Sequence, residues 1–210
     1  MINPVTFSRN NTKTRILIAA SRVFAEKGYK NTTVQDICSA SEANIAAVNY
    51  HYKSKENLYR IVWDHLYKFN EQANEELFRD DLDPKVQLKH FVSTRIKSTL
   101  DNGELGYLSK LISYELNSPT TSYDHIYENY LKERINWVLR LIDRLTKGKL
   151  DQSSKEQIFF LVNSPIIRLN ETIMNNNKFI HHSTLRINDE LIDNMYNYIL
   201  GGIYQICIGK

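Results

Sequence analysis

The sequence predicts an all-α protein that begins with a three-helix bundle. Apolar residues recur at intervals of three and four along most of the 210-residue chain, and no stretch of useful length alternates as a strand does. The seven glycines mostly fall at the ends of predicted helices. With 42% apolar and 24% charged residues, the composition is that of an ordinary globular protein. We expect two domains, residues 1–53 and residues 54–210.

The first predicted helix covers residues 12–27 and supports the two helices that follow it. Its apolar residues keep the spacing of one buried helical face, and they are Ile16, Ala19, Ala20, Val23 and Phe24. Phe24 is the expected core anchor. Gly28 is placed to end the helix in a left-handed conformation. Residues 1–11 are polar and are interpreted as a loose arm, because chain termini are commonly frayed.

Two short helices joined by a tight turn come next. Thr33 is the predicted N-cap of a helix over residues 33–40, because its hydroxyl can accept a hydrogen bond from a free N–H group of the first turn. Asp36 stands three residues later, in the capping-box position. Ser41 and Glu42 make the turn. A second helix directly after such a turn completes a helix-turn-helix.

The second short helix, residues 44–51, has the composition of a DNA recognition helix. Such a helix lies in the major groove with its N-terminal residues at the base edges. It therefore needs small residues for close approach and amide groups for hydrogen bonding. Ala46 and Ala47 leave the room, and Asn44 and Asn49 supply the amides. Asn44 is also the predicted N-cap of this helix.

The residues that follow predict contacts to the DNA backbone. Val48 lies one turn after Asn44 and is expected to point inward and hold the helix on the core. Tyr50, His51 and Lys55 are hydrogen-bond donors suited to phosphate oxygens, which fix the register of a protein on DNA without reading sequence. Ser54 is the predicted cap of the next helix, so free N–H groups would also lie near the phosphates.

Three stretches of this region resemble the DNA-binding domain of the TetR family of bacterial repressors. They are ILIAASRVFAEKGY, TTVQDIC and NIAAVNYHYKSKENLY. The recognition-helix sequence NIAAVNYH and the later segment YELNSPT, residues 114–120, are similar to one subgroup of that family. The resemblance implies a phosphate contact for Thr33. It implies base-facing positions for Gln35, Ile45, Ala46 and Ala47, and contacts to bases or backbone for Asn49, Tyr50, His51 and Lys55.

Two residues depart from the family pattern. Glu42 stands in the turn where the family usually has glycine, so either the turn avoids a positive φ or it carries a strain of about 1 kcal/mol. Asn49 stands where the family usually has tyrosine. Because asparagine pairs well with adenine, this departure predicts an altered base preference.

The larger domain is predicted to contain six further helices, which cover residues 54–79, 84–100, 104–117, 123–146, 157–174 and 188–208. In the first of these the residues that are apolar at helical spacing are Leu58, Ile61, Val62, Leu66 and Phe69. The last two are apolar on nearly every side, so each must be buried on more than one face. The resemblance implies that these two helices form the interface of a homodimer.

A small-molecule pocket is expected between the helices of residues 84–145, because pockets form between the helices of bundles. The residues expected to line it are Tyr107, Leu111, Tyr114, Glu115, Tyr127 and Trp137. Each of them is equally compatible with an ordinary core position. No feature of the sequence identifies the ligand.

Catalysis and metal binding are disfavoured. His125, His181 and His182 lack the Cys/His spacing of metal sites, and we expect neither a metal nor a cofactor. The sequence has no G-x-S-x-G motif and no glycine-rich phosphate loop, so we expect no enzyme. Cys38 and Cys207 are expected to be reduced thiols.

The sequence predicts no membrane segment. It contains no apolar run of eighteen residues, and its start lacks the apolar core of a signal peptide, so we expect a cytoplasmic protein. Residues 1–60 carry nine Lys and Arg against four Asp and Glu, whereas the remaining residues have a small negative balance. The basic excess therefore lies at the end that carries the helix-turn-helix.

Together these patterns predict a TetR-type transcriptional regulator. We expect a homodimeric repressor that binds a palindromic double-stranded DNA operator through residues 1–53 and releases it when residues 54–210 bind a small ligand. The alternative is a helical protein-interaction module without sequence-specific DNA binding. Salt distinguishes the two, because phosphate contacts release counterions and weaken steeply as salt rises.

Overall fold

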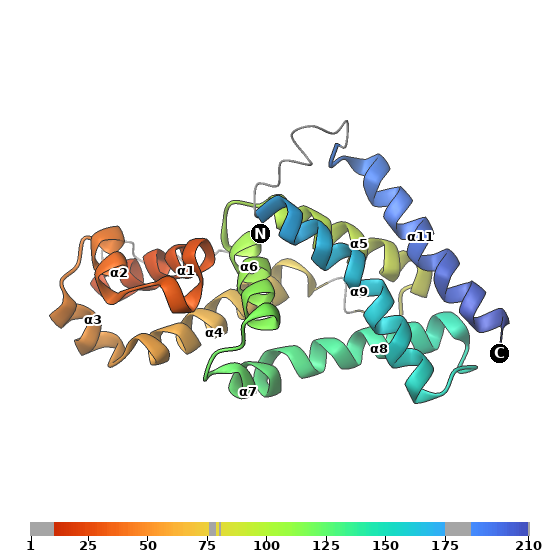
Figure 1. Cartoon of the computed structure of the whole chain (residues 1–210), viewed down its shortest axis with the longest axis horizontal. Helices are drawn as coiled ribbons and strands as arrows, with labels where there is room; N and C mark the ends of the chain where they lie inside the picture. The colour runs from red at the N-terminus through yellow and green to blue at the C-terminus, as the bar shows by residue number, and fades with distance from the viewer. Residues whose placement is uncertain (1–10, 76–78, 80, 175–185, 210) are drawn as a thin grey trace. The chain divides into compact units, whose positions relative to one another are not determined.

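The computed structural model describes residues 11–75, 79, 81–174 and 186–209, and its secondary structure in these ranges is entirely helical (Figure 1). The chain divides into two compact units. Unit 1 holds residues 1–70 and 102–126, and unit 2 holds residues 71–101 and 127–210. The all-α prediction is confirmed. The functional division after residue 53 stays a prediction.

The described part of unit 1 contains the helix-turn-helix, most of the helix that follows it, and two later helices. Its elements are α1 (Thr12–Asn31), α2 (Val34–Ser41), α3 (Ile45–Tyr52), most of α4 (Lys55–Ala73), α6 (Glu104–Asn117) and α7 (Tyr123–Ile126). Helix α1 packs against α2, α3 and α6. Chain segments far apart in sequence thus build one core around α1.

Helix α1 runs past its predicted end. Gly28 has φ 73° and ψ 162°, so the helix is interrupted there, and one further turn reaches Asn31. The positive φ agrees with the prediction, but this ψ lies outside the left-handed helical region. A Cβ atom on Gly28 would come within 3.3 Å of the Tyr114 ring of α6. Glycine at this position therefore allows both the unusual backbone conformation and the close approach of α6.

The core of unit 1 is built on aromatic side chains. The Phe24 and Tyr59 rings lie 4.9 Å apart edge to face, and Tyr59 and Trp63 lie 6.4 Å apart. Of the residues at apolar helical spacing in α4, Ile61 is only half-buried and Phe69 is 38% exposed. Tyr59 and Trp63 are fully buried, because their side of α4 faces the other aromatic side chains of unit 1.

Unit 2 is a bundle of four long helices. Its elements are α5 (Pro84–Leu100), a π-helix labelled η2 (Tyr127–Leu131), α8 (Lys132–Thr146), α9 (Gln152–Met174) and α11 (Asp189–Ile208). Helix α5 packs against α8, α9 and α11. The shared core draws side chains from all four helices, among them Phe91, Trp137, Ile166 and Ile199.

The later helices differ from prediction in three places. The single helix expected over residues 123–146 is divided by the π-helix, because i→i+5 bonding leaves no periodic pattern in the sequence. Helix α9 begins five residues earlier than predicted and continues through Pro165. The helix expected over residues 54–79 ends at Ala73, and its predicted continuation over residues 76–78 lies outside the described residues.

Candidate DNA-binding interface

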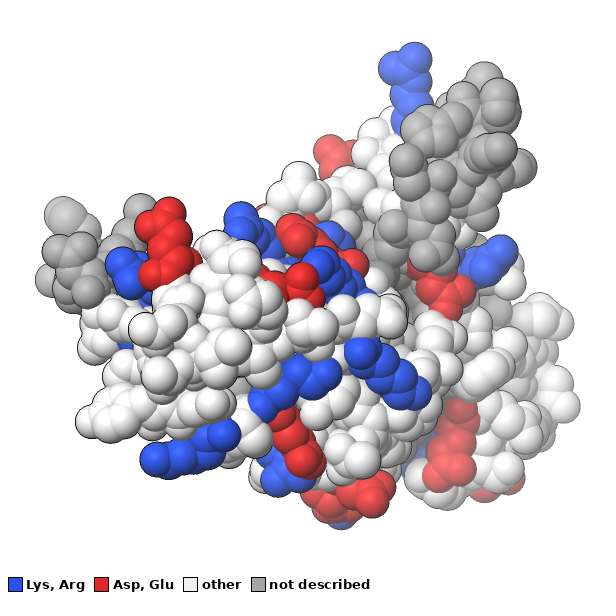
Figure 2. Space-filling view, turned by 60° about the vertical axis from the view of Figure 1, so that its left-hand side comes forward, with Lys and Arg blue, Asp and Glu red and all other residues white. Residues whose placement is uncertain are grey.

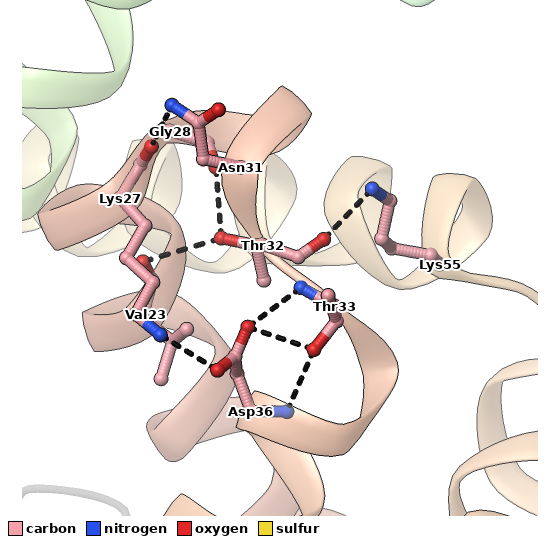
Figure 3. Close-up of polar contacts among 8 residues, drawn as sticks. All are labelled: Val23, Lys27, Gly28, Asn31, Thr32, Thr33, Asp36 and Lys55. Carbon is pink, nitrogen blue, oxygen red and sulfur yellow. Dashed lines mark hydrogen bonds and ion pairs between the residues drawn. The ribbon is translucent and has the colours of Figure 1, made fainter.

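The start of α2 is fixed by a complete capping box (Figure 3). The Thr33 hydroxyl accepts the Asp36 N–H at 3.1 Å, and the Asp36 carboxylate accepts the Thr33 N–H at 2.8 Å. The Thr33 hydroxyl also donates to Asp36 at 2.8 Å. The predicted cap is confirmed. Because both donors of Thr33 are engaged here, its phosphate contact would compete with the cap.

A lysine of α1 reinforces this cap. Lys27 Nζ lies 2.6 Å from the second carboxylate oxygen of Asp36 (Figure 3). The hydrogen bond from Lys27, and then those from the Thr33 backbone and hydroxyl, hold the pKa of Asp36 well below its ordinary value. Asp36 therefore carries its charge at the N-terminus of α2, where the helix dipole favours it.

Lys55 ties the start of α4 to the connection between α1 and α2. Its Nζ donates to the carbonyl oxygens of Tyr29 at 3.0 Å and Thr32 at 2.8 Å, and it lies 4.3 Å from the centre of the Tyr29 ring. Thr32 is itself buried, and its hydroxyl donates to the Gly28 carbonyl at 2.8 Å (Figure 3). The contacts of Lys55 are internal to the protein, so its phosphate contact stays a prediction.

The turn between α2 and α3 contains a residue in a strained conformation. Glu42 ends α2 with φ 52° and ψ 40°, in the left-handed region. Its N–H and that of Ala43 both donate to the Cys38 carbonyl. The turn thus keeps the glycine geometry without glycine, which costs about 1 kcal/mol.

Helix α3 is capped as predicted and presents one face to solvent. Asn44 Oδ1 accepts the Ala47 N–H at 2.8 Å, while Val48 is buried against the core. The exposed positions include Ile45 at 49% and Tyr50 at 76%. Ala46, Asn49 and Asn44 are exposed as well, as is Gln35 on α2, whereas Ala47 and His51 are half-buried. Their DNA contacts stay predictions.

Two residues at the end of α3 were missed in the sequence. Tyr52 is fully buried, and its hydroxyl donates to the Lys13 carbonyl of α1 at 2.6 Å. Burial raises the pKa of Tyr52 to about 12. Lys53 follows with φ 68°, and it is exposed. Within the described part of the chain its side chain makes no hydrogen bond or ion pair, which leaves its charge available for a phosphate.

The basic charge of this end is dispersed. Figure 2, in which it comes forward, shows Lys and Arg side chains interspersed with acidic groups and broad uncharged surface. Some of the basic groups are already paired, as Lys27 is with Asp36 and Arg60 is with Glu56 at 2.9 Å. The excess of basic residues in the sequence therefore overstates the charge that is available to DNA.

The residues expected to line a ligand pocket divide between the two units. Tyr107, Leu111, Tyr114 and Glu115 lie on α6 of unit 1, and Tyr127 and Trp137 lie in unit 2. The Tyr114 hydroxyl donates to the Glu26 carbonyl at 3.2 Å, and Trp137 packs against Phe91 at 5.8 Å. These contacts give each a packing role, and their ligand contacts stay predictions.

The other sites considered in the sequence can be checked over the described ranges. There, no group of His, Cys, Asp and Glu side chains is arranged to hold a metal ion. His181 and His182 lie outside those ranges, as does most of the predicted polar arm. Cys38 and Cys207 are free thiols. None of the helices searched is both long and apolar enough to span a membrane.

A capped pair of short helices, with the second presenting small and amide side chains to solvent, has the geometry of a helix-turn-helix of the DNA-binding type. Residues 16–62 match the sequence profile of "Bacterial regulatory proteins, tetR family". The region around the helix-turn-helix is thus similar to the DNA-binding domain of this family.

Known relatives agree with this similarity. The HTH-type transcriptional repressor NicS of Pseudomonas putida is 31% identical over 84 residues, which is 40% of each chain. This chain thus spans less than half the length of NicS. The HTH-type transcriptional dual regulator CecR of Shigella flexneri is 28% identical over 153 residues, 68% of each chain. The fatty acid degradation regulator FadR from Bacillus halodurans shares the fold, with a TM-score of 0.66 at 18% identity over 92% of this chain and 96% of that one.

Proposed function

We propose that this protein is a TetR-type transcriptional repressor that binds a palindromic operator as a homodimer and releases it on binding a small ligand. The observation that carries the proposal is the exposed face of α3, held by the Asn44 cap on one side and the buried Val48 on the other. Two such helices, related by a two-fold axis, would enter successive major grooves about 34–36 Å apart. Repression is favoured because one relative, NicS, is named a repressor.

Exposed apolar residues on α9 and α11 support the dimer. Phe160 is 70% exposed on α9, and Tyr198 is 71% exposed on α11. Leu161 and Ile208 add further exposed apolar surface to the same helices. Large apolar side chains on long helices are favourable at a subunit interface and unfavourable in water. Phe160→Glu should convert a dimer to a monomer, and the mass of the particle in light scattering tests this.

The effector mechanism follows from linkage. The dimer would have two conformations, one whose recognition helices fit the operator and one whose recognition helices do not. A ligand that binds the second conformation more tightly lowers the DNA affinity, and its differential affinity for the two conformations sets the size of the effect. The similarity of NIAAVNYH and YELNSPT to one subgroup supports placing this chain there, with Asn49 as its own variation. We expect a cytoplasmic protein without catalytic activity.

The first experiment is selection of bound sequences from a random double-stranded DNA pool, followed by salt titration of the winning sequence. A palindrome whose affinity falls steeply with salt would support the operator-binding function. A folded dimer that enriches no sequence, with or without candidate ligands, would contradict it and favour the protein-interaction module.

A further inference from the structure

Arg95 is a buried charge in unit 2, and no counter-charge pairs with it among the described residues. It lies on the inner side of α5, one turn after Phe91, and only 8% of its surface is exposed. Its Nε is fully enclosed and has no hydrogen-bond partner among the described residues. Burial, and then the positive charge of Arg134, lower the pKa of the guanidinium to about 9. The neighbouring charge is therefore of the same sign.

Arg95 shares the buried side of α5 with residues of the apolar core and with a few polar groups. Phe91 and Trp137 pack 5.8 Å apart within the same core. One turn after Arg95, the Thr99 hydroxyl is hydrogen-bonded to Asn170 of α9. Thr99 and Asn170 are both buried. Apolar walls with a small number of fixed polar groups are the usual composition of a small-molecule site.

A buried guanidinium whose Nε has no partner in the described part of the chain is costly for folding alone. Removing an arginine from water without a partner destabilises a protein, and an apolar side chain of similar length fills the same space without that cost. A buried unsatisfied polar group therefore indicates a missing partner or a functional role. For a cationic guanidinium, a complementary partner from outside the described residues would be an anion.

We propose that Arg95 anchors the carboxylate of an otherwise apolar small molecule bound within unit 2. The inference rests on the proposed function, because this molecule would be the effector. A carboxylate matches the planar guanidinium through two parallel hydrogen bonds and brings one negative charge. It would also reduce the repulsion between Arg95 and Arg134. The neutral, apolar remainder of the molecule would lie against the Phe91 and Trp137 side of the core.

The test is thermal unfolding of the full chain, without DNA, in the presence of linear monocarboxylates from butanoate to decanoate and of benzoate. Each acid is compared with its uncharged amide. At about one hundred times its dissociation constant, a bound acid should raise Tm by about 5–10 °C, and its amide should have little effect. The proposal is overturned if none of these acids raises Tm more than its amide.

Arg95→Met separates ligand binding from folding. This variant should lose the acid-dependent rise in Tm, and its own Tm should equal or exceed that of the unmodified protein. Arg140→Met is the matched control, because Arg140 lies on the exposed side of α8 and pairs with Glu133 at 2.8 Å. It should keep the full response. A marked fall in the Tm of Arg95→Met, or an unchanged response to the acid, would overturn the proposal.

The same measurements distinguish this inference from the proposed function. Specific DNA binding without any response to acids would contradict the carboxylate site and leave the regulator intact. An acid that binds through Arg95 without weakening the operator complex would support the site and contradict release by this ligand. Weakening of the complex in the unmodified protein, but not in Arg95→Met, would support both.

Discussion

The Tyr59 hydroxyl donates to Glu115 Oε1 across 2.8 Å, and this bond joins α4 to α6 inside unit 1. Glu115 is fully buried, and it also accepts the Thr120 N–H at 3.0 Å and the Thr120 hydroxyl at 2.9 Å. Three donors thus satisfy one buried carboxylate. Helix α4, which directly follows the helix-turn-helix, is therefore joined to α6 by a buried polar contact.

Glu115→Gln should lower the free energy of unfolding by about 1–3 kcal/mol, because the amide NH2 would face a donor at one of these positions. Chemical denaturation measures the change. Tyr50→Phe is the control, since the Tyr50 side chain is exposed. Equal stabilities for Glu115→Gln and the unmodified protein would show that the network does not contribute to folding.

Glu42→Gly should stabilise the protein by about 0.5–1 kcal/mol, because glycine adopts φ 52° without strain. Glu42→Ala keeps the Cβ atom and should bring no such gain. Chemical denaturation of the two variants separates the free energy of backbone strain from the effect of losing the carboxylate. A gain in the alanine variant as large as in the glycine variant would assign the effect to charge.

Asn49→Ala should weaken operator binding by about 1–3 kcal/mol and leave non-specific binding unchanged, because an asparagine amide reads adenine. The side chain is exposed, so folding should be unaffected. The affinity for the selected operator measures specific binding, and the affinity for a scrambled sequence measures non-specific binding. An equal loss on the two sequences would assign Asn49 to the DNA backbone. Asn44→Ala is less informative, since Asn44 also caps α3.

Lys53→Ala should weaken specific and non-specific binding alike and reduce the salt slope of the dimer by about 2, as expected for one lost phosphate contact in each subunit. Lys55→Ala should instead destabilise the fold by about 1–2 kcal/mol, because its Nζ bonds to two carbonyl oxygens would be lost. Salt titrations and thermal melts of both variants separate these roles. A stable Lys55→Ala protein with a reduced salt slope would restore the phosphate role of Lys55.

Asp36 makes stability depend on pH in a defined direction. Its pKa is lowered in the folded state, so its contribution is fully present above the ordinary aspartate pKa of about 3.9 and is lost as pH falls below that value. The Tm of the unmodified protein should therefore exceed that of Asp36→Asn near neutral pH, and the two should converge on acidification. A difference in Tm that stays constant down to pH 3 would contradict this account.

The sequence predicted the elements whose boundaries depend on local chemistry. Thr33, Asp36 and Asn44 cap α2 and α3 as expected, since these bonds reach only three residues along the chain. Helices α5 and α6 begin and end where predicted, because Asp83-Pro84 and the 101–103 turn are strong boundary signals.

What was missed depends on contacts distant in sequence. The buried stripe of α4 is set by its packing partners, and Lys55 bonds to backbone carbonyls that have no sequence signature. The isolation of Arg95 is visible only when its surroundings are known. The identity of the base-reading side chains stays a prediction, because the sequence and fold define the exposed face and not its partner.

The bond from Tyr52 to the Lys13 carbonyl places the beginning of α1 beside the end of the recognition helix. An affinity tag fused a short distance before Asn11 would therefore be tethered near the end of the recognition helix. A polyhistidine or basic tag would add its own phosphate contacts there, so protein for the binding measurements should be prepared with such a tag removed.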